Sequence, residues 1–239
     1  MENKLRIGID VNEIIRAKWF QFDKYYIEEF GEEGSPQQPY VYDYFKHYKW
    51  EDTKEDINYL NEDLPDDIHP QFYKVDPETG EAPVDAMAFR KRTVNLTAKQ
   101  IYERFMFEDF LFEIHGMGSM MYKGVDQHIE KFYYKFKDRV DFRIVSKENH
   151  FTIPPTLFFL SKIVCRLKKY IFVESNEEMW DNVDILITTD PELLENIPEG
   201  KRVIKVTRPY NKEITSEFEV NQVFDLIDKE EFEKLITKI

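Results

Sequence analysis

Polar side chains that could handle a phosphate group follow three short apolar runs in this sequence. They are Asp10 with Asn12, then Ser146, then Thr188 with Thr189 and Asp190. An aspartate can act as a nucleophile or bind a divalent cation, and a serine hydroxyl can hold a phosphate oxygen. These residues form one site only if the runs are parallel strands of one sheet, because ligands lie beyond the carboxyl ends of such strands.

The remainder of the chain favours that arrangement. Apolar, β-branched runs typical of buried strands alternate with segments of helical periodicity. The runs are 5–10, 140–145, 170–173, 184–187 and 203–206, with a possible edge strand at 223–227, and the helical segments are 154–167, 176–180 and a last helix capped by Asp228 and Glu231. We therefore predict an α/β fold with a doubly wound parallel sheet.

A long segment separates the first run from the second. Residues 14–26 have helical spacing, residues 30–85 are rich in Pro, Gly and acids, and Thr97 with Gln100 predicts a capped helix that ends at 116–118. A further helix is predicted at 125–136. We expect a core of residues 1–19 and 131–239, and an inserted, partly helical cap of residues 20–130 with an irregular arm at 30–90 and helices at about 97–136.

The order of these motifs resembles the haloacid dehalogenase (HAD) superfamily, and within it the 5′(3′)-deoxyribonucleotidase-type phosphatases. The matching segments are GIDVN at 8–12, FRIVS at 142–146, DILITTDP at 184–191 and RPYN at 208–211. The resemblance implies a HAD-like core with a cap, Asp10 as the nucleophile and Ser146 on the phosphate. It also implies Mg²⁺ held by Asp10 and an acid near the fourth motif, for which Asp190, or Asp184 after a shift of register, is available.

The sequence departs from that family pattern at the residues that carry the chemistry. Asn12 replaces the second acid, Thr188 and Thr189 replace an acidic pair, and Glu178 stands where a lysine is expected, although Lys168 or Lys169 could substitute. Loss of proton transfer alone costs about 10²–10⁴-fold in rate, and hydroxyls are poor ligands for a hard cation. We predict vestigial roles for Asn12 and Ser146, no enzymatic activity and no cofactor.

Composition restricts the partners. The chain has 47 Asp and Glu against 33 Lys and Arg, a formal net charge of −14, which opposes nucleic acid and anionic membranes. Its single cysteine, Cys165, excludes an internal disulfide, and the five histidines show no metal-ligand spacing. We expect no signal peptide and no transmembrane segment, and a location in the cytoplasm or in a virion.

An aromatic segment at 40–50 has two interpretations. Its residues are Tyr40, Tyr42, Tyr44, Phe45, Tyr48 and Trp50. They could pack the cap against the core, or they could form a docking surface for another protein, because aromatic residues are enriched at the centres of interfaces. Acids at 51–56 oppose the stacking of nucleic-acid bases on this segment.

The predicted function is that of a structural or interaction subunit in a larger protein assembly. The abundance of Lys, Glu, Asp, Tyr, Phe, Ile and Asn is similar to proteins from A/T-rich phage genomes, which favours a component of a bacteriophage virion or its tail. The alternative is a magnesium-dependent nucleotidase or phosphatase that forms an aspartyl-phosphate intermediate on Asp10.

Overall fold

Six short strands form a parallel sheet that is buried on both faces. The computed structural model describes residues 4–36, 42–59, 90–163, 167, 169–227 and 230–237. The strand order is β10-β9-β8-β1-β6-β7, and every neighbouring pair is parallel. The strands are β1 (Leu5–Ile9), β6 (Val140–Lys147), β7 (Tyr170–Val173), β8 (Ile185–Thr188), β9 (Arg202–Val206) and β10 (Glu219–Val220).

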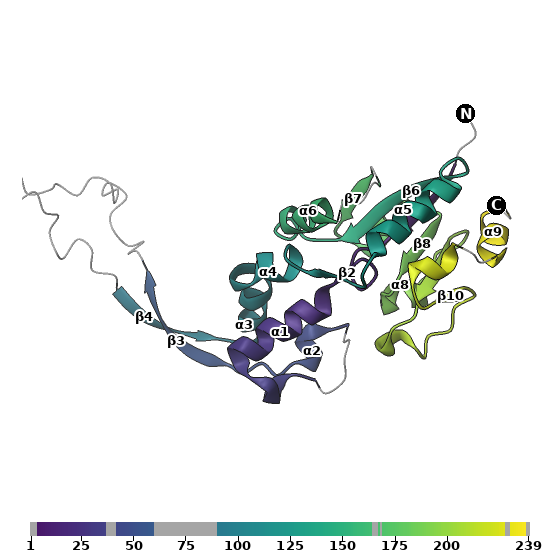
Figure 1. The fold of residues 1–239 in the computed structure, drawn as a ribbon. Helices are drawn as coiled ribbons and strands as arrows, with labels where there is room; N and C mark the ends of the chain where they lie inside the picture. Colours follow the sequence, from purple (N-terminus) through teal and green to yellow (C-terminus); the bar gives the residue numbers. More distant parts are fainter. Residues whose placement is uncertain are drawn as a thin grey trace, which may run out of the picture. The chain divides into compact units, whose positions relative to one another are not determined.

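Alternate residues of the strands supply two separate hydrophobic clusters. Ile7 and Ile9 of β1 belong to one cluster, whereas the Cα of Gly8 faces Val183 and Leu186 of the other. A Cβ on Gly8 would lie 2.5 Å from Val183 Cγ1, so this position in the central strand requires glycine. Helices therefore cover both faces (Figure 1), and the doubly wound parallel α/β fold is confirmed.

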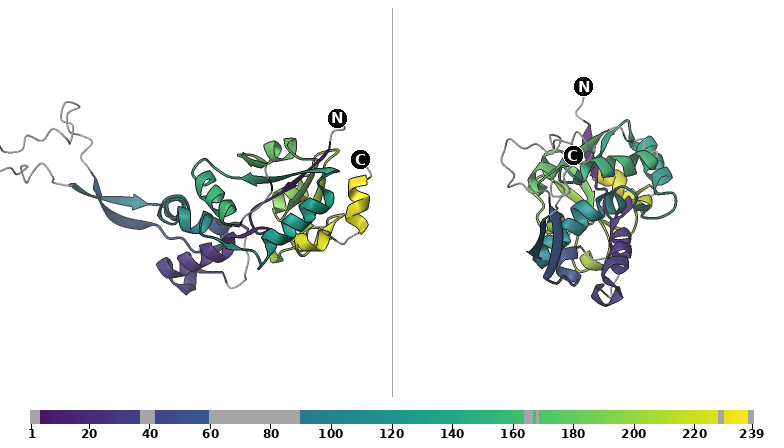
Figure 2. Two further views of the ribbon diagram at one scale, coloured as in Figure 1. Left: turned by 45° about the horizontal axis from the view of Figure 1, so that its top comes forward. Right: turned by 90° about the vertical axis from the view of Figure 1, so that its left-hand side faces the viewer.

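The helices that follow β6, β7, β8 and β10 pack on these two clusters. They are α6 (Ile153–Lys162), α7 (Asn176–Asp181), α8 (Pro191–Glu195) and α9 (Glu230–Thr237). The predicted helix at 125–136 is α5 (Val125–Phe136), whose buried side chains join the same cluster as β1 and β6. Figure 2 shows α5, in teal, beside α9, in yellow, where Phe132 and Phe136 contact the ring of Phe232.

The segment after β1 differs from its prediction. The helix expected from residue 14 begins at Lys18, as α1 (Lys18–Phe30), and is preceded by the two-residue strand β2 (Arg16–Ala17), which pairs with β5 (Ser119–Met120). The reason is a tight turn, in which the amides of Ile15 and Arg16 both donate to the carbonyl of Val11 and Glu13 adopts a positive φ of 57°.

Regular structure also occurs where an irregular arm is predicted. The described part contains a 3₁₀ turn (Glu32–Gly34), α2 (Tyr44–His47) and the strand β3 (Thr53–Tyr59), which pairs antiparallel with β4 (Arg90–Leu96). The chain divides into two compact units, Met1–Lys49 with Glu103–Ile239, and Trp50–Tyr102. The turn expected at 76–80 lies outside the described residues.

The capping box at Thr97 is confirmed, since Gln100 N donates to Thr97 Oγ1 and Thr97 N donates to Gln100 Oε1. The single helix predicted after it is instead three pieces: α3 (Ala98–Arg104), a π-helical turn (Phe105–Asp109) and α4 (Leu111–His115). The Gly116–Gly118 stretch ends α4 as predicted.

The edge strand predicted at 223–227 is wrong. Val223–Leu226 is a 3₁₀ turn, and the edge strand is Glu219–Val220 instead. Asp225 Oδ2 accepts from the amides of Asn221 and Gln222, which favours a helical turn, and Val223 and Leu226 are both buried at helical spacing. The apolar helix predicted to reach about 167 ends at Lys162, and both Cys165 and the capping residue Asp228 lie outside the described residues.

Candidate functional site

The parallel register brings the predicted site residues to one edge of the sheet. Ile9 of β1 is paired with Ile144 of β6 and with Ile187 of β8. Asp10, Ser146 and Thr188 therefore all lie at the carboxyl edge, as the sequence predicts, with Thr189 and Asp190 directly after β8. Asp184 comes before β8, at the opposite edge, where its carboxylate pairs with Arg6 at 2.5 Å, so a register shift does not bring it to the site.

Asp10 is buried, and hydroxyl and amide groups satisfy its carboxylate. Oδ1 accepts from the amide of Val11 at 2.7 Å, and Oδ2 accepts from Thr188 Oγ1 at 3.1 Å. Burial, together with the nearby charge of Asp190, raises the pKa of Asp10 to about 7. Near neutral pH this side chain is therefore divided between a neutral acid and a carboxylate.

Both carboxylate oxygens of Asp190 accept hydrogen bonds, from donors that are near in the sequence and from one that is distant. As the N-cap of α8, it accepts from the amides of Glu192 and Leu193 through Oδ1. Its other oxygen, Oδ2, accepts from the hydroxyl of Tyr42 at 2.5 Å and lies 3.8 Å from Lys147 Nζ. Asp10 and Asp190, which we call the Asp10–Asp190 pair, interact electrostatically and are both buried.

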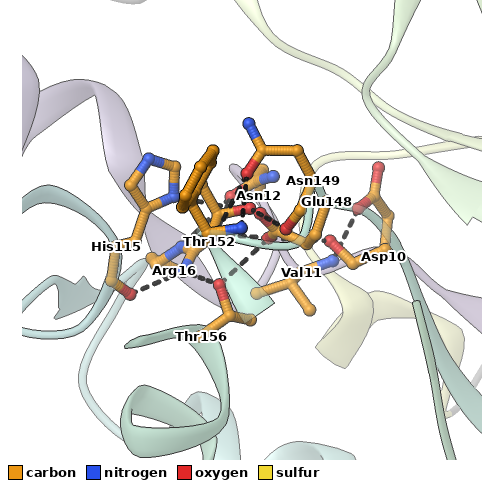
Figure 3. Close-up of polar contacts among 11 residues, drawn as sticks. Asp10, Val11, Asn12, Arg16, His115, Glu148, Asn149, Thr152 and Thr156 are labelled. Carbon is orange, nitrogen blue, oxygen red and sulfur yellow. Dashed lines mark hydrogen bonds and ion pairs between the residues drawn. The ribbon is translucent and has the colours of Figure 1, made fainter. Parts of the chain in front are cut away.

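Asn12 and Ser146 belong to a second group, built around a fully buried arginine (Figure 3). We call it the Arg16 cluster; its members are Asn12, Arg16, Ser146, Glu148 and Thr156. Arg16 Nη2 donates to Glu148 Oε1 at 2.9 Å and to Asn12 Oδ1 at 2.6 Å. Arg16 Nη1 donates to Thr156 Oγ1 at 2.8 Å and to the carbonyl of His115 at 2.6 Å.

Glu148 is the anionic centre of the Arg16 cluster. Its Oε1 also accepts from Ser146 Oγ at 3.2 Å and from Thr156 Oγ1 at 3.1 Å. The amide oxygen of Asn12 and the hydroxyl of Ser146 are thus bound within the chain. Burial lowers the pKa of His115, whose Nδ1 lies 3.9 Å from Glu148 Oε2, so its imidazole is neutral at neutral pH.

Two lysines that the sequence analysis missed provide positive charge at this edge. Lys147 Nζ donates to Asn176 Oδ1 at 2.9 Å and lies close to Asp190. Lys18 begins α1, and its Nζ lies 5.7 Å from the centre of the Tyr44 ring; burial lowers its pKa to about 8 despite the charge of Glu148. The position of Lys147 directly after Ser146 was the available signal, because a strand one residue longer carries it to the edge.

Of the residues considered for the expected lysine position, the structure describes Lys169 and Glu178. Lys169 pairs with Asp141 at 2.7 Å, Glu178 accepts from the amide of Glu174, and Lys168 lies outside the described residues. The described lysines at the carboxyl edge, Lys18 and Lys147, thus come earlier in the chain than the lysine that the motif order predicts.

The described side chains offer a bound magnesium ion few free ligands. Among the described residues, no three His, Cys, Asp or Glu side chains gather as a group that could hold a metal. The two acids expected to hold it already accept hydrogen bonds through both oxygens, and the ammonium group of Lys147 stands beside Asp190. A divalent cation there would have to displace these partners.

Most of the aromatic segment packs inside its own chain. Tyr44 and Tyr48 are buried, and their rings lie 4.4 Å and 4.8 Å from the ring of Phe22. Phe22 belongs to the predicted cap, so these two residues pack within the cap rather than against the core. Tyr42 reaches Asp190, Phe45 is exposed, the ring of Trp50 contacts Tyr102 within the Trp50–Tyr102 unit, and Tyr40 lies outside the described residues.

Comparisons with known proteins find only distant likenesses. No protein-family profile matches the chain, and no curated protein sequence matches it. Among solved structures, a haloacid dehalogenase-like hydrolase from Burkholderia xenovorans LB400 is similar with a TM-score of 0.48 and 12% identity, over 95% of this chain and 99% of that one.

Two further solved structures are similar at the same level. A dehalogenase gives a TM-score of 0.43 and 9% identity over 95% of this chain and 96% of its own. A haloacid dehalogenase-like family hydrolase from Xanthomonas campestris gives 0.43 and 9% over 98% and 97%. TM-scores below 0.5 at these identities leave the family of this chain unassigned. Within the described residues, no helix has the length and apolar character needed to cross a membrane.

Proposed function

We propose that this chain is a catalytically degenerate HAD-like protein that acts by binding other proteins in a larger assembly, and that it does not hydrolyse phosphate esters. The observation that carries the proposal is the occupancy of the carboxyl edge. Arg16 binds the amide oxygen of Asn12, Glu148 binds the hydroxyl of Ser146, and Tyr42 binds Asp190. The groups that would bind a phosphate and its metal are therefore already hydrogen-bonded to other side chains.

The charge state of the edge supports the same conclusion. A nucleophilic aspartate must be ionised, and because the pKa of Asp10 is raised to about 7, only part of the protein carries that carboxylate at neutral pH. A general acid must exchange a proton with the leaving oxygen, and the amide of Asn12 cannot do so. The losses affect the same chemical step, so the remaining rate should be far below that of an intact phosphatase.

A phosphatase assay with Mg²⁺ tests the catalytic half of the proposal. The substrates are p-nitrophenyl phosphate and the deoxyribonucleoside monophosphates, and Asp10→Asn is the matched control. We expect no difference between the native chain and the control. Turnover that disappears in Asp10→Asn would contradict the proposal.

A second variant sharpens the test. Asn12→Asp restores the missing acid, but its carboxylate would meet the guanidinium of Arg16, which already donates to that position. We therefore expect Asn12→Asp alone to remain inactive. Activity gained from this single change would show that the Arg16 cluster does not block the edge.

Size-exclusion chromatography with light scattering tests the binding half, together with capture of partners by the immobilised chain. A chain that stays monomeric and captures no partner would count against an assembly role. A bacteriophage virion or tail remains the predicted setting, on the composition alone.

The second candidate is the magnesium-dependent nucleotidase. The position of Asp10 at the carboxyl end of β1 favours it, as do Lys18 and Lys147 near the two acids, since cations there could neutralise a phosphate. The Asp10-dependent turnover described above is the result that would select it.

A further inference from the structure

Exposed apolar side chains gather where α4 meets α6. Phe112 is 44% exposed, Met117 48%, Leu157 42% and Phe158 41%. Helices α4 and α6 pack against each other (Figure 1). We call Phe112, Met117, Leu157, Phe158 and Lys162 the α4–α6 face. Gathered exposed apolar groups of this kind mark interaction surfaces more often than scattered ones do.

Direct contacts join four of these five side chains, and Leu157 is next to Phe158 in the sequence. The rings of Phe112 and Phe158 lie 4.9 Å apart, and Lys162 Nζ lies 5.2 Å from the ring of Phe158 and 3.9 Å from Met117 Sδ. Gly116 allows the approach of the two helices, because a Cβ there would lie 2.9 Å from the carbonyl oxygen of Phe112 and 3.2 Å from Pro155 Cβ.

Helix α6 is apolar on two sides. Its buried residues Pro155, Thr156, Phe159 and Leu160 pack inward. The exposed residues Pro154, Leu157, Phe158, Ser161 and Lys162 recur at helical spacing on the other side. Only the inward side is needed to attach α6 to its sheet, so the outward apolar side calls for a different explanation.

The sequence segment that contains α6 differs in charge from the whole chain. Residues 149–173 contain no Asp or Glu, although the chain has 47 of them and a net charge of −14. Lys162 is the charged residue of α6, and it stands at the edge of the exposed rings. The α6 side of this face therefore suits an acidic partner, whereas α4 carries Glu113 beside Phe112.

A second copy of the chain and an anionic membrane suit it less well. In a symmetric pairing through this face, helix α6 of the second copy would offer no carboxylate to Lys162, since residues 153–162 contain no Asp or Glu. Anionic lipid surfaces are typically bound by clusters of about four to eight Lys and Arg, whereas α6 offers Lys162 alone. An acidic amphipathic helix satisfies both requirements, since it offers an apolar stripe and carboxylates together.

We propose that the α4–α6 face binds an acidic amphipathic helix of a protein partner, whose apolar side chains pack on Phe112, Leu157 and Phe158 and whose carboxylates meet Lys162. The inference supplies a binding surface for the proposed function, on whose binding half it rests. It does not require the carboxyl edge to be inactive, so phosphatase activity and loss of helix binding are separate outcomes.

Selection from a displayed library of random peptides, each about 16 residues or four helical turns long, tests the proposal on the immobilised full chain. We expect enriched peptides with Leu or Phe at helical spacing and an excess of Asp and Glu. Fluorescence anisotropy then measures the affinity of the synthetic peptides. Leu157→Ser/Phe158→Ser should weaken binding by about tenfold or more, and Lys162→Glu by about threefold or more, with weaker binding at high salt.

Ile197→Ser is the matched control, because Ile197 is 41% exposed and lies outside the α4–α6 face; it should leave the affinity unchanged. Circular dichroism verifies that each variant is folded, and Lys162→Glu provides the test if the double variant is not. The proposal is overturned if no peptides are enriched, if the enriched peptides are basic, or if the variants bind as the native chain does.

Two further measurements distinguish the other occupants. Sedimentation with phosphatidylcholine vesicles, with and without phosphatidylserine, would reveal a membrane-binding face if the chain bound and Leu157→Ser/Phe158→Ser did not. Light scattering would reveal a self-associating face if the same variant converted a dimer to a monomer. Either result would replace the acidic helix as the occupant, whereas a monomer that ignores vesicles agrees with it.

Discussion

The Arg16 cluster and the Asp10–Asp190 pair lie at the same edge of the sheet, yet they accommodate buried charge differently. In the Arg16 cluster, a guanidinium with no exposed surface faces Glu148 and three neutral acceptors. In the Asp10–Asp190 pair, two acids interact electrostatically. Hydroxyls and backbone amides donate most of the hydrogen bonds that stabilise these carboxylates. The charge of Arg16 is neutralised by Glu148. The charge of Asp10 is reduced by protonation, because burial raises its pKa.

This difference determines where protonation can alter the stability of the molecule. Breaking the ion pair leaves a buried charge without a partner, which costs stability at every pH near neutrality. Asp10 can instead take up a proton near pH 7, so the cost of its burial depends on pH. Three substitutions test this contrast, beginning with the largest expected effect.

Arg16→Met should lower the free energy of unfolding by about 3–5 kcal/mol, because Glu148 stays buried without its cation. Urea denaturation followed by tryptophan fluorescence measures this loss. Adding Glu148→Gln should recover part of it, since the amide oxygen can still accept from Ser146 and Thr156. The control is Arg139→Met, which removes an exposed pair with Glu233 and should cost less than about 1 kcal/mol. Equal losses in the two single variants would remove the distinction drawn here.

Asp10→Asn should stabilise the protein at pH 8 by about 1–3 kcal/mol, and the gain should vanish near pH 4. The folded protein holds the Asp10 proton up to about pH 7, whereas the unfolded chain releases it near pH 4. The native chain therefore loses stability as the pH rises between these values, and the variant does not. Urea denaturation at a series of pH values measures both curves.

Asp184→Asn serves as a control, because its effect on stability at pH 8 should have the opposite sign. Arg6 lowers the pKa of Asp184, so its carboxylate contributes stability above the unfolded pKa that is lost as the pH falls through the folded one. This variant should be less stable than the native chain at pH 8, and the difference should shrink in acid. If both aspartates gave the same sign, the pKa of Asp10 would not be raised by its site.

Tyr42→Phe should have the smallest effect, a loss of about 1 kcal/mol, because it removes one half-buried hydrogen bond to Asp190. A double-mutant cycle with Asp190→Asn isolates that bond from the helix-capping role of the aspartate. A coupling energy near zero would mean that the hydroxyl of Tyr42 does not stabilise the Asp10–Asp190 pair.

Part of this architecture is predictable because it follows periodic patterns. Alternating apolar strands and helices predict the parallel sheet, and the sheet places Asp10, Ser146 and Thr188 at one edge. The 3₁₀ turn at Val223–Leu226 was also within reach, since Val223 and Leu226 stand three residues apart with Asp225 placed to cap the turn.

The side chains that surround the site were harder to predict from the sequence. Arg16 stands in a segment of helical spacing, where an arginine is normally a surface residue, and its burial depends on the turn in which Glu13 has a positive φ. The contact of Tyr42 with Asp190 joins residues 148 positions apart and has no local signal. Sequence periodicity predicts which side chains are buried and on which side of a strand or helix they lie. These contacts depend instead on how segments distant in the sequence pack together.

The turn after Asp10 has one anchor from the far end of the chain. The carbonyl of Glu13 accepts from Nε and Nη2 of Arg208, which follows β9 and lies 195 positions later. Closing so long a loop carries an entropic cost that is recovered only when β9 has joined the sheet. During synthesis, then, the first strand and its acidic residue emerge early, but the loop that orients them can gain this clamp only after Arg208 has emerged.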